Sequence, residues 1–200
     1  MENIKTEIIN LLRQTNREGI DNVIKYLEAS HFFTDPASCN NHYNFEGGLA
    51  KHSYNVMRTA IAIRKAMIEI EPSLEQKIPE SSVIICSLLH DICKVNKYVK
   101  AKKWKKNEKN QWESYDSWEI GEDKFPIGHG EKSVIMLLTL GLKMSADEML
   151  AIRWHMGIWD IDKGYYETVK NFDNATNQSP LVCILQTADN MSTHVVENID

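Results

Sequence analysis

The sequence VIICSLLHDICKV, from Val83 to Val95, predicts a helix at the centre of the fold. It begins with a continuous apolar run, which Ser81 or Ser82 can cap as a helix. It ends in the pair His90-Asp91, with Lys94 about one turn further on. A compact helical bundle brings an apolar helix of this kind to its centre. The pair alone is weak evidence of function because short motifs arise by chance, so its meaning depends on partners elsewhere in the chain.

Most of the remaining chain also has helical periodicity. The other predicted helices, defined by apolar residues at spacings of three and four, cover residues 4–14, 19–30, about 48–70, a segment ending near Gly141, 145–155 and 179–198. Ser145 and Glu148 have the spacing of a capping box, and Pro180 occupies the first position of the last helix. Residues 71–80 and 156–178 are predicted to be loops, because proline and polar or aromatic residues interrupt the pattern there.

Residues 98–126 interrupt this helical pattern. The sequence YVKAKKWKKNEKNQWESYDSWEI, from Tyr98 to Ile120, interleaves aromatic and charged residues around a polar NEKN turn, which predicts an inserted β-hairpin. We therefore predict an all-α fold, a mainly helical bundle with a small β-hairpin insertion at about 98–126. Residues 1–200 are expected to form one domain that includes N-terminal helices within residues 1–30.

Composition excludes several classes of protein. No apolar run approaches the roughly 18 residues of a membrane helix, and the N-terminus lacks the apolar block of a signal peptide, so we expect a cytoplasmic protein that does not enter a membrane. No CxxC motif occurs, which argues against a zinc ribbon. Cys86, Cys93 and Cys183 lie in apolar helical contexts and are predicted to be buried free thiols.

Ligand-type residues recur beside glycines and at helix ends. His52 follows Gly47-Gly48, His129 stands between two glycines, and His155 ends the helix MLAIRWH. Asp189 lies within the apolar sequence VCILQTADNMS, where an unpaired carboxylate would cost several kcal/mol, so it needs a cation. Each residue taken alone is more often a cap or a hydrogen-bonded core residue. Together with His90-Asp91, on helices that a bundle brings to its centre, they predict a metal site.

The ordered set of these residues resembles the HD-domain metal-dependent phosphohydrolase superfamily. GGLAKHSYNV is similar to the family's first-histidine helix, LLHDICK to its central helix and TADNMS to its closing aspartate helix, over about residues 42–193. The chain departs from the pattern at Cys93, where the family has glycine. The resemblance implies one or two divalent ions (Mn, Fe, Ni, Co, Zn or Mg). The implied ligands are His52, His90, Asp91 and Asp189 for the first ion, and Asp91, His129 and His155 for the second.

The resemblance also implies residues that meet the substrate. His42, just before the glycine pair, corresponds to a histidine that relatives use near the substrate, although a surface-loop role is an equal alternative. Lys94 lies one turn beyond His90, where its ammonium can reach a phosphate oxygen. A salt bridge from Lys94 to Glu46, Glu131 or another acid is the alternative. Asp91 and Lys94 are the predicted catalytic residues.

These residues predict a metal-dependent phosphohydrolase that acts on a phosphomonoester or phosphodiester of a nucleotide or similar small molecule. Three alternatives stay open at this point: a nucleic-acid processing phosphodiesterase or exonuclease, a non-catalytic regulatory module with the same fold, and a di-iron oxygenase. Residues 94–109 contain eight lysines and one glutamate, and with nearby tryptophans they suit a nucleic-acid strand. They equally suit a solvated edge strand, and the net charge of −5 favours the small substrate.

Overall fold

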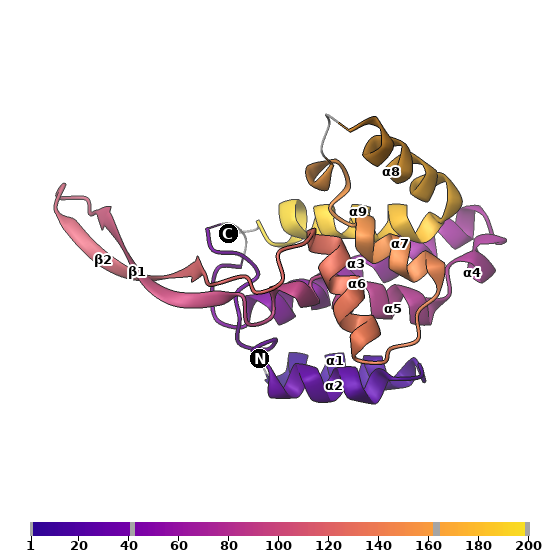
Figure 1. The fold of residues 1–200 in the computed structure, drawn as a ribbon, viewed down its shortest axis with the longest axis horizontal. Coiled ribbons are helices and arrows are strands. Elements are labelled where there is room, and N and C mark those ends of the chain that lie inside the picture. Colours follow the sequence, from indigo (N-terminus) through magenta and orange to yellow (C-terminus); the bar gives the residue numbers. More distant parts are fainter. Residues whose placement is uncertain (1, 41–42, 162–164, 199–200) are drawn as a thin grey trace.

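The computed structural model describes residues 2–40, 43–161 and 165–198. Over these residues the chain forms nine α-helices, three short helical turns and one antiparallel hairpin (Figure 1). The α-helices are α1 (Glu2–Gln14), α2 (Ile20–Ala29), α3 (Gly48–Ile70), α4 (Leu74–Lys77), α5 (Glu80–Leu89), α6 (His129–Thr139), α7 (Ala146–Trp154), α8 (Tyr166–Gln178) and α9 (Pro180–Met191). The short turns are η1 (Ile92–Lys94), η2 (Gly157–Asp160) and η3 (Ser192–Val196), and the strands are β1 (Tyr98–Lys106) and β2 (Trp112–Ile120). The predicted all-α class with a small hairpin is confirmed.

Helix α5 forms the centre of the core. Its residues from Ser82 to Leu89 are all buried, and it packs against α1, α3, α7 and α9. A helix that is apolar on every side is stable only when other elements surround it. The C-terminal end of α5 therefore lies inside the protein, where His90 and Asp91 are 0% and 2% exposed.

The amphipathic helices α1 and α2 cover one side of this body and pack against each other. Arg17, in the link between them, donates hydrogen bonds of 2.6 and 2.7 Å to the two carboxylate oxygens of Glu148 on α7. Glu148 also completes the predicted capping box with Ser145, which is confirmed. This ion pair joins the N-terminal helices to the second half of the chain.

The hairpin projects from one end of the helical body (Figure 1). Strands β1 and β2 pair antiparallel, in a register that runs from Tyr98 opposite Ile120 to Lys106 opposite Trp112. In the turn, the N–H of Asn107 donates to the carbonyl of Gln111 at 2.9 Å, and Asn110 adopts a left-handed φ of 60°, which asparagine tolerates. The predicted insertion at 98–126 therefore consists of the two strands and the first residues of the segment that connects β2 to α6, which has no regular secondary structure.

Two segments predicted to be loops contain helices. Helix α4 lies within residues 71–80, and α8 occupies most of residues 156–178. Helix α8 buries Ala175, and its Phe172 packs against Trp154 with ring centroids 5.6 Å apart. Its apolar residues are few, so the packing surface of α7 and α9 stabilises this helix more than its own periodicity does.

Two further expectations were wrong in detail. Helix α5 begins at Glu80 directly after Pro79, rather than after a cap at Ser81 or Ser82. Cys183 is exposed, because it lies on the outer side of α9, whereas Cys86 and Cys93 are buried as predicted. Among the described helices, none has the length and apolar character that crossing a membrane requires.

Candidate metal centre

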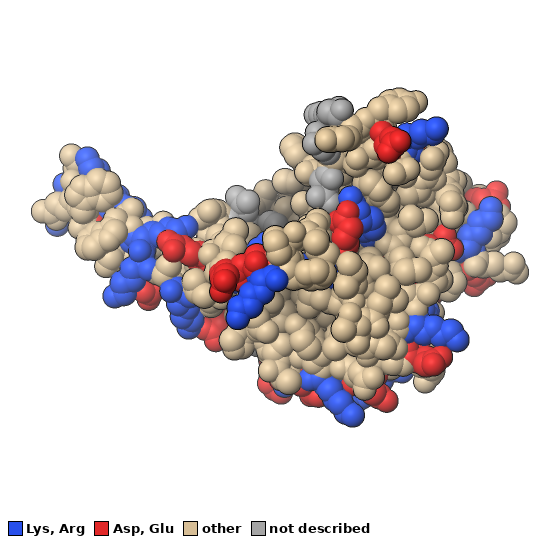
Figure 2. Space-filling model, in the orientation of Figure 1, with Lys and Arg blue, Asp and Glu red and all other residues tan. Residues whose placement is uncertain are grey.

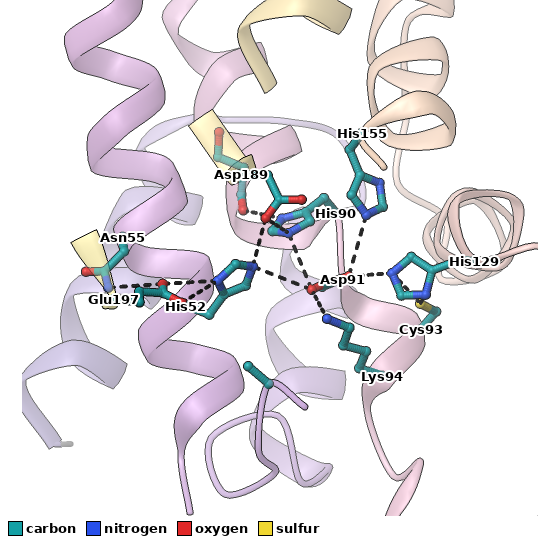
Figure 3. Close-up of polar contacts among 12 residues, drawn as sticks. His52, Asn55, His90, Asp91, Cys93, Lys94, His129, His155, Asp189 and Glu197 are labelled. Carbon is teal, nitrogen blue, oxygen red and sulfur yellow. Dashed lines mark hydrogen bonds and ion pairs between the residues drawn. The ribbon is translucent and has the colours of Figure 1, made fainter. Parts of the chain in front are cut away.

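Six residues predicted to be metal ligands come together where five segments meet (Figure 3). His52 lies on α3, His90 and Asp91 follow α5, His129 begins α6, His155 follows α7, and Asp189 lies near the end of α9. Three groups of them have ligand atoms within 4.8 Å of one another: His52, His90 and Asp91; His90, His155 and Asp189; and Asp91, His129 and His155. Each group could hold a metal ion.

Close backbone packing brings two of the histidines together. A Cβ atom at Gly130 would lie 2.2 Å from the carbonyl oxygen of Arg153, so only glycine permits the start of α6 to approach the end of α7 this closely. As a result the rings of His129 and His155 lie with centroids 5.2 Å apart. Of the two glycines that flank His129, the one on its C-terminal side, Gly130, is therefore required by this close packing.

One carboxylate oxygen of Asp91 faces the first set of ligands. Its Oδ2 atom lies 3.4 Å from Nε2 of His90 and 3.7 Å from Nε2 of His52. The same oxygen lies 2.6 Å from Nζ of Lys94, which is thus held at the edge of the cluster. Lys94 therefore forms a salt bridge, as the alternative interpretation predicted, and its partner is Asp91 of the site.

The other oxygen of Asp91 faces the second set. Its Oδ1 atom lies 2.6 Å from Nε2 of His129 and 3.6 Å from Nε2 of His155. The two oxygens of one carboxylate therefore face two separate pairs of imidazoles. This arrangement suits a carboxylate that bridges two cations.

The tautomers of two histidines leave nitrogens directed into the site. Nδ1 of His90 donates to the carbonyl of Ser87 at 2.8 Å, and Nδ1 of His155 donates to the carbonyl of Ile152 at 2.6 Å. Within the described part of the chain, Nε2 of each ring is buried and makes no hydrogen bond. Buried polar atoms are usually satisfied, and a backbone-bonded Nδ1–H is the common arrangement of a metal-binding histidine. The donor set thus fits a divalent metal.

A carboxylate that the sequence did not indicate supports His52 from behind. Nδ1 of His52 lies 3.1 and 3.2 Å from the two carboxylate oxygens of Glu197, which also accepts a hydrogen bond of 3.2 Å from Asn55. The Glu197 side chain is fully buried. On the opposite edge of the ring, Nε2 lies 3.2 Å from Asp189. Glu197 follows η3 in a polar segment, so no local pattern distinguished it.

The charges of the cluster depend strongly on one another. Burial would raise the pKa of Asp91, but Lys94 and the surrounding histidines hold it well below the usual range of a carboxyl. Burial would lower the pKa of Lys94, but Asp91 raises it, so Lys94 is an ammonium at neutral pH. In the same way burial opposes protonation of His52, yet Asp189, Glu197 and Asp91 raise its pKa to about 9. The cluster thus attracts cations.

Cys93 contacts one of the predicted ligands. Its Sγ atom lies 3.3 Å from Nδ1 and 3.7 Å from Nε2 of His129. Burial, followed by the charge of Asp91, raises the pKa of this thiol to about 11. Cys93 is therefore a neutral thiol that positions His129 by a weak hydrogen bond.

A cleft of about 400 Å³ opens onto the cluster. His52, Asp91, Lys94, His155 and Asp189 line its base. Trp159, which is 81% exposed, and His194 also line it. A larger cavity of about 790 Å³ lies near Arg17 and Glu148, but none of the six clustered residues lines it. We therefore assign the candidate site to the smaller cleft, because the ligand-type residues line that cleft.

His42 lies outside the described residues, so its predicted substrate role stays a prediction. Scans against protein-family models, curated proteins and solved structures found no match to this chain. The observations that stand are a helical fold and a buried histidine and aspartate cluster that could bind metal.

Proposed function

We propose that this protein is a metal-dependent phosphohydrolase with an HD-domain type of site, which cleaves a phosphomonoester or phosphodiester of a nucleotide or similar small molecule. The observation that carries the proposal is the carboxylate of Asp91. Its two oxygens face separate pairs of imidazoles, as expected of a bridging ligand between two ions. We assign the first ion to His52, His90, Asp91 and Asp189, and the second to Asp91, His129 and His155.

Such ions would lower the pKa of water toward about 7 and neutralise charge on phosphoryl oxygens. The side chains of the protein provide the remaining parts. In hydrolysis a water oxygen forms a bond to phosphorus, the bond from phosphorus to the leaving oxygen breaks, and that oxygen takes up a proton. Phosphoryl transfer depends mainly on positioning and on charge neutralisation, and a site rich in imidazoles and one ammonium suits both.

We assign substrate binding to Lys94. Its ammonium lies 2.6 Å from Asp91, its side chain is 15% exposed, and it lines the cleft. A phosphoryl oxygen in the cleft can therefore accept a hydrogen bond from Lys94 while Asp91 keeps the side chain in place. Lys94 thus has a binding role and a charge-stabilising role.

The cleft also fits the organic part of a nucleotide. A volume of about 400 Å³ lies within the range of small-molecule sites. Trp159 offers an exposed aromatic surface beside the cluster, and a base can stack on such a surface. These features support a nucleotide-like substrate over inorganic phosphate or a sugar phosphate.

The proposal is tested by purifying the protein without chelators, measuring its metal content, and screening phosphatase and phosphodiesterase substrates with Mn, Ni, Co, Mg and Zn. We expect metal-dependent release of phosphate or of a nucleotide that chelation abolishes. The isosteric variant Asp91→Asn should lose both metal and activity. Bound iron with oxygen consumption and no activity on any phosphate ester would contradict the proposal and favour an oxygenase.

A further inference from the structure

The register of the hairpin sorts its side chains onto two different faces. In an antiparallel pair, residues directly opposite each other share a face, and successive residues alternate between faces. One face, which we call the Trp/Lys face, consists of Tyr98, Lys100, Lys102, Trp104, Lys106, Trp112, Ser114, Asp116, Trp118 and Ile120. The opposite face consists of Val99, Ala101, Lys103, Lys105, Glu113, Tyr115, Ser117 and Glu119.

The two faces differ in charge and in aromatic content. The Trp/Lys face has three tryptophans, three lysines and one aspartate, whereas the opposite face has two lysines, two glutamates and one tyrosine. The first face is therefore positive and the second is neutral. The four lysines that the sequence places together divide evenly, Lys102 and Lys106 on one face and Lys103 and Lys105 on the other. Lysine side chains are visible along the projecting hairpin in Figure 2.

Two of the three indoles of the Trp/Lys face are well exposed to a partner, and the third, that of Trp118, is half-buried. Trp104 and Trp112 are each 65% exposed, although tryptophan is one of the most apolar large side chains. Lys106 lies over the ring of Trp112 with Nζ 5.6 Å from its centroid, and Lys100 lies over Trp118 at the same distance. Cations and aromatic rings thus alternate along an exposed ribbon.

Both lysines of the opposite face have polar partners, and Lys105 also lies over the ring of Tyr115 with Nζ 5.4 Å from its centroid. Lys103 donates a hydrogen bond of 2.6 Å to Asn40 of the helical body. Lys105 lies 3.7 Å from Glu113, which neutralises it on its own face. On the Trp/Lys face, Lys100 lies 3.5 Å from Glu46 of the helical body. Lys102 and Lys106 therefore provide the charge of this face that is available to an anionic partner.

We infer that the Trp/Lys face of the hairpin binds single-stranded nucleic acid. Bases stack on exposed indoles and phosphates pair with lysines, and successive side chains on one face repeat roughly every 6.8 Å along a strand. This combination needs no base-specific hydrogen bond, so the binding tolerates many sequences. The inference concerns a surface outside the metal centre and does not rest on the proposed function.

Two other occupants fit the hairpin less well. A lipid bilayer would require an apolar tip, but the turn, residues 107–111, is Asn-Glu-Lys-Asn-Gln. A second copy that used the same face would bring together two surfaces that each carry three lysines and one aspartate, and the like net charge is repulsive. A single strand matches both the charge and the aromatic surface.

The test measures binding of a labelled oligothymidylate and of an oligouridylate to the full chain without added metal, by fluorescence anisotropy over a range of salt concentrations. Two double variants remove the same number of lysines, Lys102→Ala with Lys106→Ala, and Lys103→Ala with Lys105→Ala. A third variant combines Trp104→Ala with Trp112→Ala. All of these side chains lie on the hairpin outside the core, and circular dichroism checks that each variant stays folded.

We expect the Lys102 and Lys106 pair to weaken binding and to reduce the slope of log affinity against log salt by about 1.4, because each phosphate contact on a single strand contributes about 0.7. The Lys103 and Lys105 pair should change the slope much less. Loss of both indoles should weaken binding about fivefold or more per ring.

Absence of oligonucleotide binding at low salt would overturn the inference, as would equal effects of the two lysine pairs. Binding of vesicles that contain anionic lipid, without oligonucleotide binding, would assign the face to a membrane instead. Dimerisation that the tryptophan variant abolishes, again without oligonucleotide binding, would assign it to a second copy. None of these results depends on hydrolytic activity, so they separate this inference from the proposed function.

Discussion

The carboxylate of Glu197 lies 3.1 Å from Nδ1 of His52, although 145 positions separate the two residues in the chain. The contact directs the opposite nitrogen, Nε2, toward Asp91 and Asp189 at 3.7 and 3.2 Å. A carboxylate behind a histidine fixes the tautomer and the orientation of the ring, and makes the ring a better metal ligand. The segment that contains Glu197 is therefore part of the candidate metal centre.

The variant Glu197→Ala is expected to weaken metal binding about 10- to 100-fold, the usual effect of losing such an outer-shell partner. Glu197→Gln should lose less, because its amide oxygen can still accept the hydrogen bond from Nδ1. Glu108→Ala, in the hairpin turn, is the matched control. Titration of the metal-free protein with Mn or Zn against a competing chelator gives the affinities. Equal affinities for Glu197→Ala and the control would contradict this role.

Removal of His129 tests the second ion. His129 lies 2.6 Å from Oδ1 of Asp91. Of the three groups that could hold a metal, His129 belongs only to the group that it forms with Asp91 and His155. His129→Ala should therefore reduce the metal content at saturation from two ions per chain to one. Elemental analysis of dialysed protein measures the content, with His31→Ala as the control. An unchanged ratio would show that His129 is not a ligand.

Replacement of Lys94 tests the substrate contact. Lys94→Ala should reduce turnover of a small phosphate ester about 100-fold or more, because an ammonium that faces developing charge is lost. Lys97→Ala, three positions further on, should leave turnover within a few-fold of the wild type. Removing Lys102, Lys103, Lys105 and Lys106 together should also leave it nearly unchanged. Steady-state kcat and KM with one nucleotide substrate distinguish these outcomes, and full activity of Lys94→Ala would exclude the assigned role.

The pair between Arg17 and Glu148 makes stability depend on pH. Burial raises the pKa of Glu148, but hydrogen bonds from Arg17, Ser82 and Ser145 lower it below the usual value of a glutamate. The folded state therefore binds this proton less readily than the unfolded state. The resulting stabilisation is fully present above the unfolded pKa of about 4.3, and is lost as the pH falls through the folded pKa.

We therefore expect Glu148→Gln to lower the free energy of unfolding by about 2–3 kcal/mol at neutral pH. The difference from the wild type should shrink below about pH 4, where the wild-type carboxylate begins to be protonated. Urea unfolding at several pH values measures both quantities. Glu18→Gln, an exposed neighbour of Arg17, is the control. A difference that stays constant down to the acid range would mean that the charge of Glu148 contributes nothing.

The helical class, the hairpin and most helix boundaries could be predicted from local sequence patterns. The capping box of Ser145 and Glu148 and the position of Pro180 are examples, because a helix start depends on hydrogen bonds and dihedral angles within one turn of chain. The candidate metal-binding residues could also be identified from the sequence, because imidazoles and carboxylates in apolar helices need partners. Helix α8 was missed because most of its residues are polar, so the helical spacing of its few apolar residues, among them Phe172 and Ala175, was a weak signal until their packing against α7 and α9 was known.

How those ligand-type residues meet depends on the packing of the helices and could not be predicted. The two oxygens of Asp91 face different histidines because α3, α6 and α7 pack around the end of α5, and no spacing in the sequence encodes that direction. Glu197 reaches His52 only after the whole chain has folded. Strand pairing likewise decided which lysines of the hairpin lie beside its tryptophans, because a shift of one residue in register would exchange the neighbours across the strands. Contacts between distant residues depend on packing geometry, which local sequence patterns do not contain.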